Sequence, residues 1–151
     1  MTYDIVIIGG GPAGLSAAIT ARARNKNTLV ISNPLEENPL ASSLLVENYP
    51  GMPSVGGIEL LETMHRQAAD LGTQFLEARA ISIVPLSNSF SVTTSNEVIE
   101  GRSIIIAVGA SSGGKLFSGE TEFLGRGVSY CATCDGMLFR NATVLIVGLN
   151  A

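Results

Sequence analysis

The sequence is poor in charged side chains. Charged residues make up 15% of the 151 residues, against about a quarter in ordinary soluble domains. This deficit predicts a parallel sheet buried on both faces, or surfaces that further parts of a larger protein cover, and we expect both. The 9 Lys and Arg residues form no run. The clustered basic face typical of nucleic-acid binding is therefore missing, and no nucleic-acid partner is expected.

Long apolar segments and targeting signals are missing as well. The uncharged run from Ile5 to Ala21 is interrupted by Gly9-Gly10-Gly11-Pro12, whereas a membrane span needs about 20 mostly apolar residues. Asp4, rather than a basic segment, precedes this run, so the pattern does not indicate a signal peptide. We therefore expect a cytoplasmic protein with no membrane segment, in a reducing compartment.

The first thirty or so residues predict a βαβ unit. Tyr3–Ile8 and Leu29–Ser32 are short runs rich in Ile, Val and Leu, typical of buried strands. Between them, Gly9–Gly14 predicts a glycine turn, and the Ala-rich segment Leu15–Arg24 predicts a helix. The fold class is therefore predicted to be α/β.

The remaining pattern predicts one long helix, several strands and two irregular segments. Asn33–Tyr49 contains two prolines and reads as a long, functional loop. Gly57–Leu71 has apolar residues at helical spacing. Ser111–Gly127 is glycine-rich and is the candidate domain boundary. The predicted strands are Thr73–Leu76, Ala80–Pro85, Phe90–Thr94, Val98–Glu100, Ile104–Val108 and Ala142–Val147.

The glycine turn fits the dinucleotide-binding pattern G-x-G-x-x-G. Gly9 would allow the tight turn, Gly11 the approach of a pyrophosphate to the backbone, and Gly14 close packing of helix on strand. The amino end of the following helix attracts the anion. The pattern alone leaves FAD and NAD open, and a purely structural turn is the less favoured alternative. An acidic residue often ends the second strand to bind the ribose, but Ser32-Asn33 stands there.

The two cysteines form the motif Cys131-Ala132-Thr133-Cys134. At this spacing one thiolate can attack a disulfide and the other can resolve the mixed disulfide. Asp135 follows directly and is a candidate proton donor and acceptor. Half of a zinc site is the alternative, which is disfavoured because the chain offers no other Cys and only one His.

Two further polar features are interpreted as ordinary surface. His65, the only histidine, falls on the polar side of the predicted Gly57–Leu71 helix, so we expect a solvated helix residue. Glu36-Glu37 is most simply a solvated loop face.

Three segments carry a family resemblance. Glu47–Gly51, Ala107–Ala110 and Gly125–Gly136, together with the glycine turn, resemble the low-molecular-weight thioredoxin reductases over essentially the whole chain. The resemblance implies a three-layer, Rossmann-like FAD-binding domain over residues 1–114, whose C-terminal return would lie beyond this chain. Residues 115–151 would be a linker and the beginning of a second, inserted Rossmann-like domain that carries the two cysteines. An apolar last strand without a covering helix also led us to expect that the chain is truncated.

The resemblance also implies site residues, cofactors and partners. Cys134 would face the flavin, and Cys131 would attack the disulfide of a thioredoxin-like protein. Asn48 would lie near the flavin, and a homodimer would be the full-length form. Ser32–Leu40 would be the loop that lies along FAD. The implied FAD-binding residues are Gly9, Gly11, Pro12, Ala13, Gly14, Ser32, Asn33, Leu40, Ala107 and Gly109.

Three departures from the family pattern bear on the flavin contacts and on the electron donor. The family's Gly-Gly-Gln stretch is replaced by Asn38-Pro39-Leu40-Ala41, and its Ala-Thr-Gly strand end by Ala107-Val108-Gly109. A second nucleotide turn, expected as G-x-G, reads Gly148-Leu149-Asn150, where the Asn side chain would crowd a pyrophosphate. This last change is similar to the ferredoxin-dependent flavin thioredoxin reductases. NADPH and reduced ferredoxin are both retained as donors, and a non-catalytic FAD-binding fragment or pseudoenzyme remains the alternative function.

Overall fold

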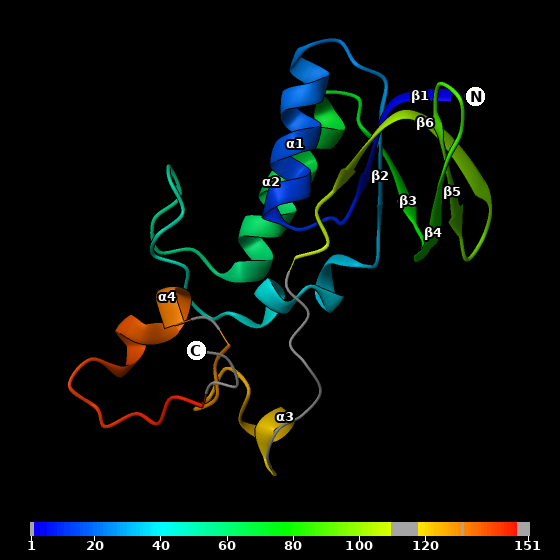
Figure 1. The fold of residues 1–151 in the computed structure, drawn as a ribbon. Helices are drawn as coiled ribbons and strands as arrows, with labels where there is room; N and C mark the ends of the chain where they lie inside the picture. Colours follow the sequence, from blue (N-terminus) through cyan, green and yellow to red (C-terminus); the bar gives the residue numbers. More distant parts are fainter. Residues whose placement is uncertain (1, 110–117, 131, 148–151) are drawn as a thin grey trace.

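The structure, a computed structural model, describes residues 2–109, 118–130 and 132–147. Figure 1 shows two long helices beside a curved sheet, with the later residues below them. The strands are β1 (Thr2–Ile8), β2 (Thr28–Ser32), β3 (Gln74–Glu77), β4 (Ala80–Pro85), β5 (Phe90–Thr94) and β6 (Val98–Ile106). The helices are α1 (Pro12–Ala23), α2 (Gly57–Asp70), α3 (Glu120–Phe123) and α4 (Ala132–Asp135), with short 3-10 turns η1 (Leu35–Glu37), η2 (Pro39–Ser42) and η3 (Gly136–Phe139).

The strands of the described residues form one six-stranded sheet in the order β3-β2-β1-β6-β5-β4. β3, β2, β1 and β6 are parallel, and β5 and β4 continue the sheet as an antiparallel meander. β1 lies between β2 and β6, so its carboxyl end at Ile8 meets those of both neighbours at one edge. Ligands of open α/β sheets bind at this kind of edge.

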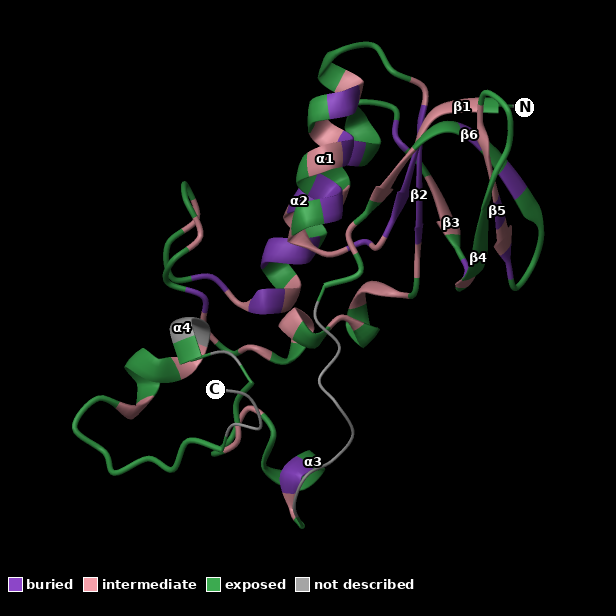
Figure 2. Cartoon of the chain, in the orientation of Figure 1, coloured by how far each residue is buried: buried purple, intermediate pink, exposed green. Residues whose placement is uncertain are grey.

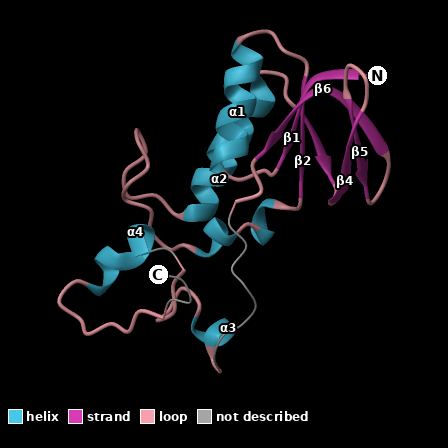
Figure 3. Ribbon diagram, viewed as in Figure 1, coloured by secondary structure: helices cyan, strands magenta, loops and turns pink. Residues whose placement is uncertain are grey.

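Alternate residues of the parallel strands enter two different apolar layers. Ile7 and Val30 pack with Ala18 of α1 and Ala68 of α2 on the helical face. The opposite face of the same two strands, which includes Val6, packs against residues of β5 and β6. Helices on one face and strands on the other give the three-layer α/β fold that the sequence predicted (Figure 3).

One strand boundary was predicted wrongly. Val98–Glu100 and Ile104–Val108 were expected as two strands, but β6 runs without a break from Val98 to Ile106. Gly101, the apparent breaker, lies inside the strand, where an added Cβ would come within 2.6 Å of Val6 Cγ2. Glycine at this position therefore permits close approach of β6 to β1 rather than ending a strand.

The predicted last strand is also wrong. Residues of Ala142–Val147 have no regular secondary structure, and Leu145 and Ile146 are 88% and 86% exposed. A strand needs a neighbour for its backbone hydrogen bonds, and no described strand pairs with this run. In Figure 2 the buried residues gather in the helices and sheet, whereas residues after α3 are mostly exposed.

The predicted loop Asn33–Tyr49 and His65 need smaller corrections. Two 3-10 turns, η1 and η2, form within the loop. Asn38 caps η2 by accepting a hydrogen bond from the Leu40 N–H at 3.0 Å. His65 is half-buried rather than solvated, and its ring lies 3.9 Å from the ring of Phe75 in β3.

Candidate functional site

The glycine turn joins β1 to α1 and is built around backbone contacts that exclude side chains. Gly9 has φ +114°, and an added Cβ would lie 2.2 Å from the carbonyl oxygen of Ala107. A Cβ on Gly14 would lie 1.9 Å from the carbonyl oxygen of Gly9. The turn can therefore be this tight only with glycine at both positions, and it brings the end of β6 against the start of α1.

The amino end of α1 faces the edge where these strands end. Gly11 is the N-cap, and Pro12 occupies the first turn, where its missing N–H costs nothing. The next amides, Ala13 and Gly14, lie in the first turn, where a helix offers no acceptor of its own. These N–H groups and the positive end of the helix dipole make a site for an anion.

A cavity of about 750 Å³ lies over this turn. Its wall includes the ends of β1, β2 and β6 and the start of α1. Of the residues predicted to bind FAD, the wall contains Gly9, Gly11, Pro12, Ala13, Ser32, Asn33, Leu40, Ala107 and Gly109. Gly14 lies behind the wall in the packing of α1 on the turn. Asn48 is exposed and outside the wall, so its role near a flavin stays a prediction.

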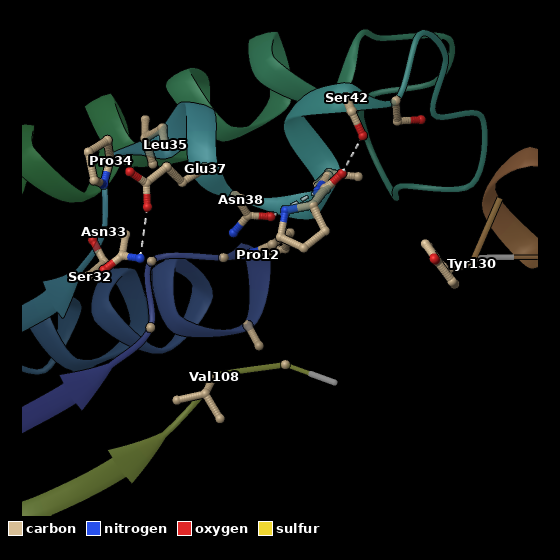
Figure 4. A pocket seen from close by; sticks show the side chains of 18 of the residues that line it. Pro12, Ser32, Asn33, Pro34, Leu35, Glu37, Asn38, Ser42, Val108 and Tyr130 are labelled. Atoms are coloured by element: carbon tan, nitrogen blue, oxygen red, sulfur yellow. Dashed lines mark hydrogen bonds between the residues drawn. The ribbon is translucent and has the colours of Figure 1, made fainter. Parts of the chain in front are cut away.

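The loop after β2 forms the far side of the cavity (Figure 4). Asn33 Nδ2 donates to Glu37 Oε2 at 2.9 Å. The Asn38 side chain points toward the glycine turn, and its Nδ2 would lie 3.1 Å from a Cβ on Gly11. The loop is anchored on α2, since the Leu40 carbonyl oxygen leaves only 1.8 Å for a Cβ on Gly57. A polar rim therefore lies opposite the helix end.

These features fit a dinucleotide. The crowded glycines leave a backbone cradle beside the helix end, which suits a pyrophosphate. The cavity has the size that cofactor sites usually have, about 300–1,000 Å³, and extends from the β2 end to Val108 and Gly109 beyond β6. FAD, when bound here, would supply two-electron redox chemistry to a neighbouring dithiol.

Asp135 connects the cysteine segment to this cavity. Its carboxylate accepts hydrogen bonds from Ser129 Oγ at 2.6 Å and from Ser43 Oγ, on the loop before α2, at 3.4 Å. Asp135 is half-buried and belongs to the cavity wall. Cys134 precedes it in α4, whereas Cys131 and the Gly148-Leu149-Asn150 turn lie outside the described residues. The roles of Cys131 and Cys134 as a dithiol and of Asp135 as a proton carrier therefore stay predictions.

Tyr130 stands at the cavity edge next to the cysteine motif. Its hydroxyl donates to a carboxylate oxygen of Glu120, which is buried in α3. This hydrogen bond, together with partial desolvation and the negative charge of Glu120, raises the pKa of Tyr130 above its usual value. The phenol is thereby held in its neutral, hydrogen-donating form.

Sequence reasoning missed several residues of the cavity wall. They come from the loop after β2 and from the segment around α3 and η3, which have no periodic pattern. Pro34, Leu35, Glu37 and Asn38 lie within Ser32–Leu40, the loop that the resemblance places along FAD, although none of the four was named individually as a binding residue. The residues missed altogether include Ser42, Ser43, Arg79, Leu124, Val128, Ser129, Tyr130, Leu138 and Phe139.

The described residues contain neither a cluster of metal-binding side chains nor a helix that could span a membrane. No group of three or more His, Cys, Asp or Glu side chains there could hold a metal ion. Among the helices of those residues, none has the length and apolar content that crossing a membrane requires.

Comparison with known proteins identifies the family of the chain. The pyridine nucleotide-disulphide oxidoreductase family pattern matches residues 3–148. The thioredoxin reductase of Aquifex aeolicus is 43% identical over 149 residues, covering 97% of this chain and 46% of that protein. The chain thus spans about half the length of the curated relatives that it matches.

Solved structures of similar proteins share the fold. A thioredoxin reductase from Streptococcus pyogenes superposes with a TM-score of 0.84 at 33% identity, over 91% of this chain and 45% of that one. A ferredoxin-flavin thioredoxin reductase from Clostridium acetobutylicum gives a TM-score of 0.68 at 38% identity, over 91% of this chain and 48% of that one. With a glycine cradle of the expected geometry and a family match over nearly its whole length, the chain belongs to the pyridine nucleotide-disulphide oxidoreductase family.

Proposed function

We propose that the protein is a flavin-dependent disulfide oxidoreductase that reduces a thioredoxin-like protein through Cys131 and Cys134. The observation that carries the proposal is the position of Asp135, which follows the dithiol directly and lies in the wall of the same cavity as the glycine turn. One cavity edge thus joins a dinucleotide cradle to a segment with redox-active spacing. Thioredoxin reductases among the relatives support the same substrate class.

In this proposal the two cysteines act in sequence. The Cys131 thiolate attacks one sulfur of the partner's disulfide, forms a mixed disulfide and releases the other sulfur as a thiolate. Cys134 then attacks Cys131 Sγ, which releases the second partner thiol and leaves a Cys131–Cys134 disulfide. Asp135 carries the proton that the leaving thiolate needs. Its hydrogen bonds from Ser129 and Ser43 hold the carboxylate in place.

The proposal includes either of two electron donors. Gly148-Leu149-Asn150 lacks the second glycine of a nucleotide turn, which favours weak use of NADPH. Reduced ferredoxin needs no nucleotide site, and a ferredoxin-flavin thioredoxin reductase is among the structural neighbours. The expected setting is a cytoplasmic homodimer.

The test is capture of the partner by single-cysteine variants of the protein at its natural length. Cys134→Ser should accumulate a mixed disulfide with an oxidised thioredoxin, because Cys131 attacks and nothing resolves the product. Cys131→Ser should capture far less, and Ser129→Ala should turn over without accumulating the adduct. Mass spectrometry under non-reducing conditions measures the adduct. Flavin binding with no capture by either cysteine variant would instead indicate a non-catalytic FAD-binding protein.

A further inference from the structure

The carboxyl end of β2 lacks the acidic residue that dinucleotide folds commonly use for a ribose. Ser32 ends the strand and Asn33 follows it, and neither carries a negative charge. A cofactor with an adenosine ribose at this edge would lose the charged acceptor for its hydroxyl groups. Another group of the cavity wall must then bind the ribose, or the ribose would be held by neutral groups only.

The η1 turn supplies such a group. It reverses the chain after Pro34, so that Glu37 returns to the end of β2 and accepts a 2.9 Å hydrogen bond from Asn33 Nδ2. Both side chains belong to the cavity wall, and Figure 4 shows this bond at the edge where β2 ends. The asparagine at the usual position of the acid thereby holds a carboxylate that comes from four residues later.

The carboxylate keeps its capacity to bind a ligand. The bond from Asn33 uses Oε2, and within the described part of the chain Glu37 makes no ion pair. Oε1 is therefore free to accept a hydrogen bond from a hydroxyl group. A charged acceptor forms shorter and stronger hydrogen bonds to hydroxyl groups than a neutral one. Glu36 and Glu37 are both exposed, but of the two only Glu37 belongs to the cavity wall.

From this geometry we infer that Glu37, positioned by Asn33, binds the hydroxyl groups of the adenosine ribose of FAD. The inference rests on the proposed function, because it requires FAD in the cavity. The acid that binds the ribose usually stands at the end of the second strand, whereas here a residue of η1 would supply it. Asn33 would position Glu37 rather than bind the cofactor directly.

The experiment measures FAD affinity rather than turnover. Flavin is removed from the protein at its natural length, and the dissociation constant for added FAD is determined from the quenching of flavin fluorescence. Glu37→Ala should weaken binding by roughly 10- to 100-fold, as loss of a hydrogen bond to a charged group does. Glu37→Gln should lose less, and Glu36→Gln, the matched control, should bind as the unmodified protein does.

A second ligand makes the test independent of any variant. FAD whose adenosine ribose lacks both hydroxyl groups should bind the unmodified protein roughly 10-fold or more weakly than FAD, whereas Glu37→Ala should no longer distinguish the two ligands. Equal affinity of the unmodified protein for both, or unchanged FAD affinity in Glu37→Ala, would overturn the inference and leave the proposed function intact. A protein that binds no FAD at all would overturn both.

Discussion

Residues 2–109 and residues 118–147 differ in how far their apolar side chains are buried. In the first region Ile7 of β1 is fully buried against the helices, whereas Ile146 in the second region is 86% exposed. The buried apolar side chains of the described residues all come from the first region. Among the second-region residues whose burial the structure describes, Glu120, a charged residue, is the one buried. An apolar run is therefore buried only where a strand or helix lies beside it.

The largest expected effect comes from apolar truncations in the two regions. Leu60, a residue of α2, is fully buried, and Leu145 is 88% exposed. In the 151-residue chain, Leu60→Ala should lower the free energy of unfolding by about 2–5 kcal/mol, and Leu145→Ala by less than about 0.5 kcal/mol. Urea unfolding followed by circular dichroism measures both. Comparable losses would mean that residues 144–147 are packed in solution, and the contrast between the regions would fail.

Glycine substitutions sharpen the comparison with a smaller effect. A Cβ on Gly14 would lie 1.9 Å from the Gly9 carbonyl oxygen, whereas a Cβ on Gly136 meets nothing within 4 Å. Gly14→Ala should cost about 1–3 kcal/mol of stability because α1 must shift away from β1. Gly136→Ala should be close to neutral in the same urea experiment. A neutral Gly14→Ala would show that the turn can widen without loss.

The hydrogen bond between Ser43 and Asp135, which joins the two regions, is expected to contribute less to stability than the Gly14 packing does. Ser43→Ala removes the 3.4 Å hydrogen bond to Asp135 together with the local 3.2 Å bond to the Leu45 carbonyl oxygen. The loss of the Asp135 bond should lower the free energy of unfolding by at most about 0.5–1.5 kcal/mol. Limited proteolysis should then cleave residues 118–147 a few-fold faster, with no change for residues 2–109. Ser42→Ala is the matched control, since Ser42 Oγ bonds only locally, to the Pro39 carbonyl oxygen. Equal cleavage of both variants would show that Ser43 does not hold the segment.

The smallest expected effect is the loss, in alkaline solution, of the stability that the Tyr130–Glu120 hydrogen bond contributes. The Glu120 carboxylate raises the pKa of Tyr130 above 10.0. The hydrogen bond therefore contributes stability that is fully present below pH 10 and is lost as the pH rises through the raised value. The free energies of unfolding of the unmodified chain and of Tyr130→Phe, compared from about pH 8 upward, should differ at about pH 8 and converge as the pH rises through the raised pKa. Parallel curves would contradict the role of this pair.

The sequence predicted the features that depend on local sterics and periodicity. The glycine turn could be predicted because Gly9 and Gly14 have no substitutes at their backbone contacts, and α2 because its apolar residues recur at helical spacing. Gly101 misled the prediction because the same residue type breaks one strand and lets another approach closely. Glu37 is exposed, as the sequence predicted, but its bond to Asn33 could not be predicted because it depends on the reversal of the chain in η1.

The position of β6 has a consequence for how the protein forms during synthesis. Thr2 in β1 pairs with Glu100 in β6, and Ile8 with Ile106. During synthesis β1 leaves the ribosome first, and it can pair with β6 only after about 100 further residues have been added. Pairings so distant in sequence close slowly. Until β6 arrives, one edge of β1 stays open, and Ala107 cannot complete the cavity. We therefore expect nascent chains that end before about residue 100 to need protection from aggregation, and flavin capture to begin only after β6 has been made.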